Sequence, residues 1–176
     1  MFVEIACIAG QSWRGVPSHF NEHTPLNQVI FSVMGSMIAL NTLLAAWLLV
    51  LYFRCETGLP PSRLWAVRLG LALFLVGNGI GGMMIGRGAH AVGVPDGGPG
   101  LPFVNWSTEG GDLRPVHAVG LHALQILPLL AGALTRIESL NEARRTTVVF
   151  AAALILLLTT AGLLVQALNG RPLLAT

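Results

Sequence analysis

The chain has 176 residues, of which 53% are hydrophobic and 10% are charged, and its mean hydropathy is +0.69. Soluble domains carry about 25% charged residues, so this composition excludes an ordinary soluble domain, a disordered chain and, with only two cysteines, a disulfide-rich secreted scaffold. The net charge of +2 provides little attraction for nucleic acid, so we expect no nucleic-acid partner.

Residues 1–27 precede the first long apolar block, and we expect them to form an outer N-terminal segment. The first nine residues are apolar but too short to span a bilayer. Glu4 and the lack of a basic start argue against a cleaved signal peptide. We therefore expect an interfacial helix at this end, or the end of a span that a longer relative would complete.

Four apolar blocks predict membrane-spanning helices at about 29–53, 64–86, 116–135 and 147–168. Each of them can cross a hydrocarbon core about 30 Å thick. Capping and breaking residues support the boundaries: Thr24-Pro25, Pro60-Pro61-Ser62, a Ser139 to Glu142 capping box, and Asn169-Gly170 with Pro172. The predicted fold is an all-α membrane protein of one domain, residues 1–176. It is a four-helix transmembrane bundle with a Gly-rich outer loop, 87–115, between the second and third helices.

The arginines indicate how this bundle is oriented. The loops after the first and third spans hold six arginines, namely Arg54, Arg63, Arg68, Arg136, Arg144 and Arg145, and the opposite side holds four, namely Arg14, Arg87, Arg114 and Arg171. Because arginine accumulates on the cytoplasmic side, we expect an integral protein of a bacterial inner membrane with both termini outside, in the periplasm.

All five histidines fall on the predicted outer side, and two of them belong to a dense polar segment, residues 13–23. His19 and His23 are four residues apart, so on a helical turn they would share a face suited to a transition metal. Arg14 and Asn21 are candidate contacts for a substrate or anion. The alternative is an interfacial belt of aromatic and polar side chains with no ligand.

The loop 87–115 is longer than a turn between two spans requires, and long loops are often functional. Its glycines allow tight turns and its aromatic residues offer anchors, so we expect an ordered lid over the outer end of the bundle. A solvated flexible loop is the alternative. Asp112 and Arg114, at the end of the loop, are further candidate contacts for a substrate or anion.

Within the membrane, His122 is the foremost candidate, because ionisable residues inside spans usually face a cavity or a partner. Gln125 lies one turn later and can share its face, whereas His117 lies 140° away around the helix. Haem b, bound by His90 with His117 or His122, is one candidate cofactor, and a transition metal is the other. The glycine-rich residues 77–82 predict close helix packing or room for a flat ligand that contacts Asn78.

The sequence contains no P-loop, dinucleotide fingerprint, nucleophile elbow or zinc-protease helix, so no catalytic residue is assigned. We expect a cofactor-binding or accessory subunit of a larger membrane complex, which could be a redox complex. Its partners would be the lipid bilayer and other proteins, or a second copy bound through small-residue helix faces. The alternative is an outer-face membrane enzyme or small transporter for an anionic or lipid-like substrate.

Overall fold

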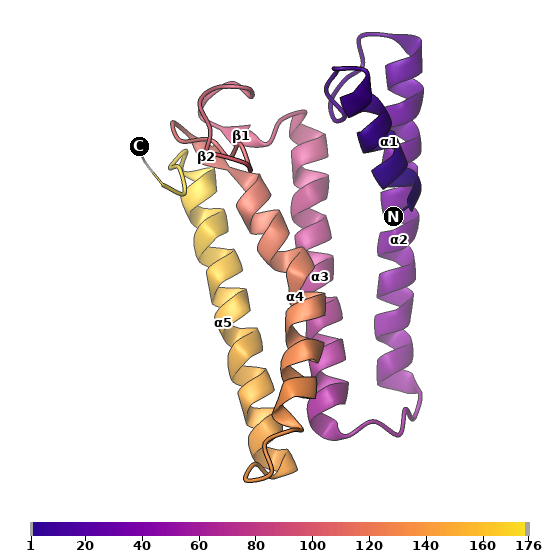
Figure 1. The fold of residues 1–176 in the computed structure, drawn as a ribbon, viewed down its shortest axis with the longest axis vertical. Helices are drawn as coiled ribbons and strands as arrows, with labels where there is room; N and C mark the ends of the chain where they lie inside the picture. The colour runs from indigo at the N-terminus through magenta and orange to yellow at the C-terminus, as the bar shows by residue number, and fades with distance from the viewer. Residues whose placement is uncertain (1, 175–176) are drawn as a thin grey trace. The chain divides into compact units, whose positions relative to one another are not determined.

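The computed structural model describes residues 2–174, and this part of the chain is mostly helical (Figure 1). The helices are α1 (Phe2–Trp13), α2 (Pro25–Arg54), α3 (Pro61–Arg87), α4 (Leu113–Leu134) and α5 (Glu142–Leu168), with two short strands, β1 (Ala91–Val92) and β2 (Gly111–Asp112), between α3 and α4. The four helices α2 to α5 are long and apolar enough to cross a membrane. The prediction of an all-α membrane protein is confirmed at this level.

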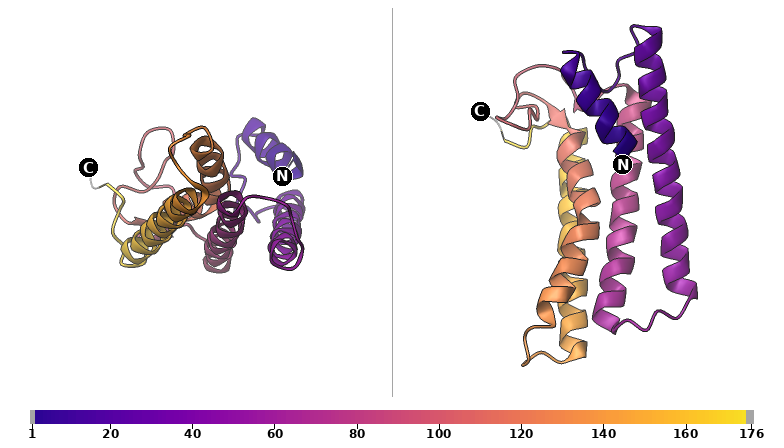
Figure 2. Two further views of the ribbon diagram at one scale, coloured as in Figure 1. Left: turned by 90° about the horizontal axis from the view of Figure 1, so that it is seen from below. Right: turned by 45° about the vertical axis from the view of Figure 1, so that its right-hand side comes forward.

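The chain divides into two compact units, residues 1–47 and 48–176, and each is described by itself. In the first unit, α1 lies beside the first half of α2 (Figure 2). The Thr24 hydroxyl accepts a hydrogen bond from the backbone N–H of Asn27 at 3.3 Å. This cap and the proline at position 25 start α2 four residues earlier than the apolar pattern alone predicts.

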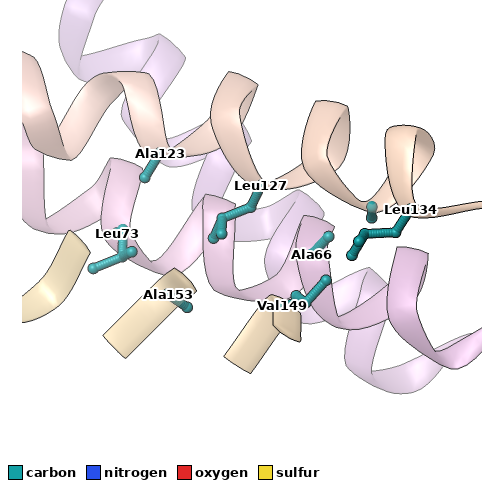
Figure 3. Packing of buried hydrophobic residues seen from close by; sticks show 8 residues of the cluster. Ala66, Leu73, Ala123, Leu127, Leu134, Val149 and Ala153 are labelled. Atoms are coloured by element: carbon teal, nitrogen blue, oxygen red, sulfur yellow. The ribbon is translucent and has the colours of Figure 1, made fainter. Parts of the chain in front are cut away.

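The second unit is built around α3, α4 and α5, which pack against one another. Its core contains side chains from all three helices, namely Ala66, Leu73, Ala123, Leu127, Ala131, Leu134, Val149 and Ala153. The cluster is drawn in Figure 3. The backbones of α3 and α4 come closest where Gly77 meets Gly120, because a Cβ at Gly120 would lie 2.6 Å from the Gly77 Cα. Close packing through small residues, one of the two predictions for 77–82, is therefore present.

The ends of two helices differ from the sequence prediction. Ser62 does not cap α3, which begins at Pro61 with no side-chain cap. Its backbone N–H instead donates to the Glu142 carboxylate at 2.7 Å, across 80 residues. The predicted capping box from Ser139 to Glu142 is also wrong, because the Asn141 side chain caps α5 and Glu142 is used by the start of α3. The stop at Asn169-Gly170 is confirmed, with Gly170 at a φ of 70°.

The loop between α3 and α4 is ordered by a small antiparallel sheet. Ala91 pairs with Asp112 and Val92 pairs with Gly111. The strand β2 lies against α5, where a Cβ on Gly111 would collide with the carbonyl oxygen of Ala167. The Asp112 side chain caps α4, so this helix begins at Leu113, three residues before the predicted span.

The last turns of α2 belong to the second unit and are bound by one arginine of α3. The Arg68 side chain donates to the Tyr52 carbonyl through Nε at 3.0 Å and Nη2 at 2.6 Å. Its guanidinium also lies 4.5 Å from the centre of the Phe53 ring. A cation at the last carbonyls of a helix stabilises that end.

Candidate functional site

Four polar side chains form a hydrogen-bonded group in the first unit, and we name Gln11, Arg14, Asn21 and Asn27 the N-terminal polar cluster. Arg14 Nη1 donates to the Gln11 side-chain oxygen and, at 2.9 Å, to the Asn27 side-chain oxygen. Asn27 in turn donates to the Asn21 side-chain oxygen at 3.0 Å. The three amide residues are buried, whereas Arg14 is exposed. The cluster therefore joins α1, the connecting segment and α2 while leaving its cation accessible.

The segment between α1 and α2 is held by its own turns. The Asn21 amide donates to the Pro17 carbonyl at 3.0 Å, and the Phe20 ring packs edge-on against Phe31 of α2. Phe20 has a φ of 55°, which a helix does not allow. The segment is consequently not helical, and the prediction that His19 and His23 share a helical face is wrong.

His19 and His23 differ in their interactions. The His19 Nδ1 atom is 2.9 Å from the Ser18 hydroxyl, and His23 is exposed in the segment just before α2. Within residues 2–174, no group of three or more His, Cys, Asp or Glu side chains is arranged to hold a metal ion. A metal at His19 and His23 stays a prediction.

In the second unit, Asp112 and Arg114 bind each other. Their closest approach is 2.6 Å, and the Asp112 carboxylate also accepts from the Ser107 backbone N–H at 2.8 Å. Arg114 donates in addition to the Asn105 carbonyl. Burial raises the pKa of Asp112, but the hydrogen bonds from Arg114 and Ser107 outweigh this effect and hold the pKa below its ordinary value. The pair orders the loop 88–112, and its charges largely cancel.

His90, at the start of this loop, is engaged by Asp96. The His90 Nδ1 atom lies 3.0 Å from the Asp96 carboxylate, and the backbone N–H groups of His90 and Ala91 donate to the same carboxylate. Burial, and next the positive charge of Arg114, lower the pKa of His90 despite the opposite effect of Asp96. His90 therefore favours the neutral imidazole.

His117 lies between α3 and α4. Its Nδ1 atom is 2.7 Å from the Gly77 carbonyl oxygen, and its ring fills the space next to Gly81, where a Cβ would lie 2.9 Å from the ring. When Nδ1 donates to a carbonyl in this way, Nε2 is the nitrogen that can bind a metal. Asn78, on the same stretch of α3, donates to the Phe74 carbonyl at 2.9 Å. The space beside Gly77 and Gly81 thus holds α4 and His117.

His122 and Gln125 lie on an exposed face of α4. Ile126 and Leu129 continue this face at helical spacing, and all four residues are exposed. We name His122, Gln125, Ile126 and Leu129 the α4 stripe. The Gln125 amide can donate to the Leu121 carbonyl at 3.1 Å and to the His122 carbonyl at 3.2 Å. Within residues 2–174, the His122 imidazole makes no hydrogen bond to another residue.

The sequence-predicted residues therefore form separate groups. Arg14 is joined to Asn21 through Asn27, and Asp112 is joined to Arg114. His90 contacts Asp96 and His117 contacts Gly77, whereas the His122 imidazole makes no hydrogen bond to another residue in the described part of the chain. Sequence reasoning missed Gln11 and Asn27, the two buried amides that complete the N-terminal polar cluster. Gln11 lies between Gly10 and Ser12, and Asn27 lies next to Gln28, so the local sequence gives no signal of their burial.

Comparison of the chain with protein-family models, with curated proteins and with solved structures finds no match in any of the three.

Proposed function

We propose that the chain is an accessory subunit of a larger membrane protein complex and that the α4 stripe binds the partner. The observation that carries this proposal is the exposed His122 inside a membrane-spanning helix. His122 lies nine residues after Leu113, which is about 14 Å along the helix at 1.5 Å per residue. Ionisable side chains at such positions rarely face lipid and usually meet a partner or a cavity.

The rest of the α4 stripe supports a helix as the partner. His122, Gln125, Ile126 and Leu129 follow the spacing i, i+3, i+4 and i+7, which is the pattern of a helix face that packs on another helix. A donor or acceptor on the partner would satisfy the imidazole. Hydrogen bonds between membrane helices contribute about 0.6 kcal/mol on average and up to about 1.7 kcal/mol, so losing this one should weaken association about 3- to 18-fold.

A second exposed face has the same character. Gln28, Ser32 and Ser36 are spaced four residues apart on α2, are all exposed, and line a groove of about 460 Å³. Small and hydroxyl-bearing residues at this spacing let helices approach closely in a membrane. A subunit that contacts neighbours through more than one helix would use such a face.

Site-specific photo-crosslinking in native membranes tests the proposal. A photoreactive amino acid in place of Ile126, in the α4 stripe, should give one discrete protein adduct. The control is Ile155 of α5, which is 63% exposed and lies on an apolar face. The substitution His122→Leu should reduce the adduct at 126, with α-helical content by circular dichroism unchanged. Equal crosslinking at positions 126 and 155 contradicts the proposal, and so does an adduct at 126 whose yield is unchanged by His122→Leu. An adduct with twice the mass of the 18.6 kDa chain identifies a second copy as the partner.

The orientation is also a proposal, with both termini in the periplasm of a bacterial inner membrane. The two cysteines provide the test, because Cys7 lies in α1 and Cys55 is exposed just after α2. A membrane-impermeant maleimide should label Cys55 only after the membrane is permeabilised. Labelling of Cys55 in intact spheroplasts would reverse the orientation.

The cofactor component of the proposal rests on the histidines and is tested separately. His117 has its Nδ1 atom at the Gly77 carbonyl, so Nε2 is the nitrogen that would bind the iron of a haem, the group that would supply redox chemistry. Protein purified from its native membrane should then show a Soret band that His117→Ala removes. A spectrum without a Soret band, together with no stoichiometric metal, rules out this component and leaves the subunit proposal standing.

A further inference from the structure

A groove runs between α1 and α2 in the first unit. It has a volume of about 400 Å³ and is lined by Val3, Ala6, Cys7, Gly10, Gln11, Arg14, Leu26 and Ile30. Six of the eight residues are apolar or glycine, and the two polar residues, Gln11 and Arg14, come from the end of α1. Ligand sites usually have volumes of about 300–1,000 Å³, with mostly apolar walls and a few polar groups that fix the orientation.

The polar end of this groove has a positive charge that no carboxylate among the described residues 2–174 neutralises. Arg14 is held by the side-chain oxygens of Gln11 and Asn27, which are neutral amides, and within residues 2–174 it forms no ion pair with a carboxylate. Both of these hydrogen bonds use Nη1. The Nε and Nη2 donors form one edge of the guanidinium and can hold two oxygens of a phosphate at once.

The polar and apolar ends of the groove match the headgroup and hydrocarbon layers of a membrane. Arg14 contacts Asn27, the third residue of α2, so the charged end lies at the start of a spanning helix, where lipid headgroups are found. Ile30 lies one turn further along α2, and Val3 and Cys7 lie further back along α1. The groove is therefore charged at headgroup level and apolar towards the hydrocarbon.

We propose that this groove binds an anionic phospholipid, with the phosphate at the Arg14 guanidinium and an acyl chain along α1 and α2. The amides of the N-terminal polar cluster hold Arg14 in position. The charge selects an anionic headgroup, because attraction to anionic lipid contributes about 1 kcal/mol per arginine. This corresponds to about fivefold tighter binding of an anionic lipid than of a neutral one. This inference does not depend on the subunit proposal, which concerns α4 and a different set of α2 residues, Gln28, Ser32 and Ser36.

Gly10 allows the groove to be closed without disturbing the cluster. Gly10 lines the groove and a Cβ there meets no other atom within 4 Å, so a leucine can be introduced at this wall of the groove without a clash at its Cβ. Leucine also favours a helix more than glycine does, so Gly10→Leu should not weaken α1. Gly132 of α4 has equally open surroundings, and Gly132→Leu is the matched control.

The experiment is a lipid titration of the full-length protein in detergent, followed by native mass spectrometry. Phosphatidylglycerol and phosphatidylcholine with identical acyl chains are compared, and inorganic phosphate is added as a competitor. We expect phosphatidylglycerol to bind about fivefold more tightly than phosphatidylcholine. Arg14→Gln should remove this preference and Gly10→Leu should weaken binding of both lipids, whereas Arg87→Gln and Gly132→Leu should change neither.

Four results overturn the proposal. One is equal binding of the two lipids by the wild-type protein, and another is a preference that survives Arg14→Gln. The third is that inorganic phosphate displaces phosphatidylglycerol fully and that Gly10→Leu leaves the affinity for phosphatidylglycerol unchanged. This result would mean that Arg14 binds a free anion and not a lipid. Arg14→Lys guards against loss of folding in Arg14→Gln. Lysine keeps the positive charge, so Arg14→Lys should retain most of the preference for phosphatidylglycerol. The fourth result is loss of this preference in a folded Arg14→Lys variant, which would contradict selection of the headgroup by charge.

Discussion

The substitution Gly77→Ala should force α3 and α4 apart. A Cβ at Gly77 would lie 2.8 Å from the Leu121 backbone nitrogen and 2.9 Å from the Gly120 carbonyl carbon. Both atoms belong to the backbone of α4, so no side-chain rotation relieves the contact. The Gly77 carbonyl is also the partner of His117 at 2.7 Å, and a shift of the helices weakens this contact.

Overpacking of this kind costs about 1–3 kcal/mol, so the ratio of folded to unfolded protein should fall about 5- to 160-fold. The assay is unfolding in mixed micelles with increasing sodium dodecyl sulfate, followed by circular dichroism. Gly79 and Gly82 are matched controls on the same helix, because a Cβ at either position meets no other atom within 4 Å. Gly79→Ala and Gly82→Ala should be neutral or slightly stabilising, since alanine favours a helix more than glycine does. If Gly77→Ala unfolds at the same detergent fraction as Gly79→Ala, the proposed close crossing is refuted.

Three further predictions concern the loop and the helix ends. Gly111→Ala should detach the loop 88–112 from α5, because the new methyl group collides with the Ala167 carbonyl, and limited proteolysis should then cleave this loop faster than in the wild type. Asp112 has a pKa below its ordinary value of 3.8 in the folded state, so its stabilising contribution is present above about pH 4 and is lost as the pH falls through the folded pKa. As the pH is lowered from about 5 to about 3, the thermal midpoint of the wild type should therefore drop more than the midpoint of Asp112→Asn; parallel curves would contradict this assignment. Glu142→Ala removes the acceptor for the Ser62 N–H, and it should lower stability by about 1–3 kcal/mol, whereas Glu142→Gln, which retains a side-chain acceptor, should cost less.

The spans were predictable because each requires a long run of apolar residues, which few other structures need. The start of α2 was equally legible, since Thr24-Pro25 is a local signal that acts on the residues next to it. The glycines of residues 77–82 also predict the close packing of α3 in the second unit, although the sequence does not tell which of them faces a neighbouring helix. Gly77 and Gly81 are filled by α4 and His117, whereas Gly79 and Gly82 are open.

Contacts between distant residues caused the errors. Glu142 matches a capping box in its own sequence neighbourhood, but its carboxylate accepts a hydrogen bond from the start of α3, 80 residues away. The spacing of His19 and His23 indicates a shared face only if the segment is a helix, and the positive φ of Phe20 prevents that. The burial of Gln11 and Asn27 was equally invisible, because it depends on how α1 meets α2.

The contact between β2 and α5 has a consequence for the order in which the protein is made. Gly111 packs on the Ala167 carbonyl, and Gly93 approaches Gly170, so the loop 88–112 rests on the end of α5, a helix that is synthesised after the loop. Until α5 has been synthesised and inserted, this loop has no surface to rest on. A nascent chain that ends before α5 should thus expose the loop to proteases and quality-control factors, and insertion of α5 would end that exposure.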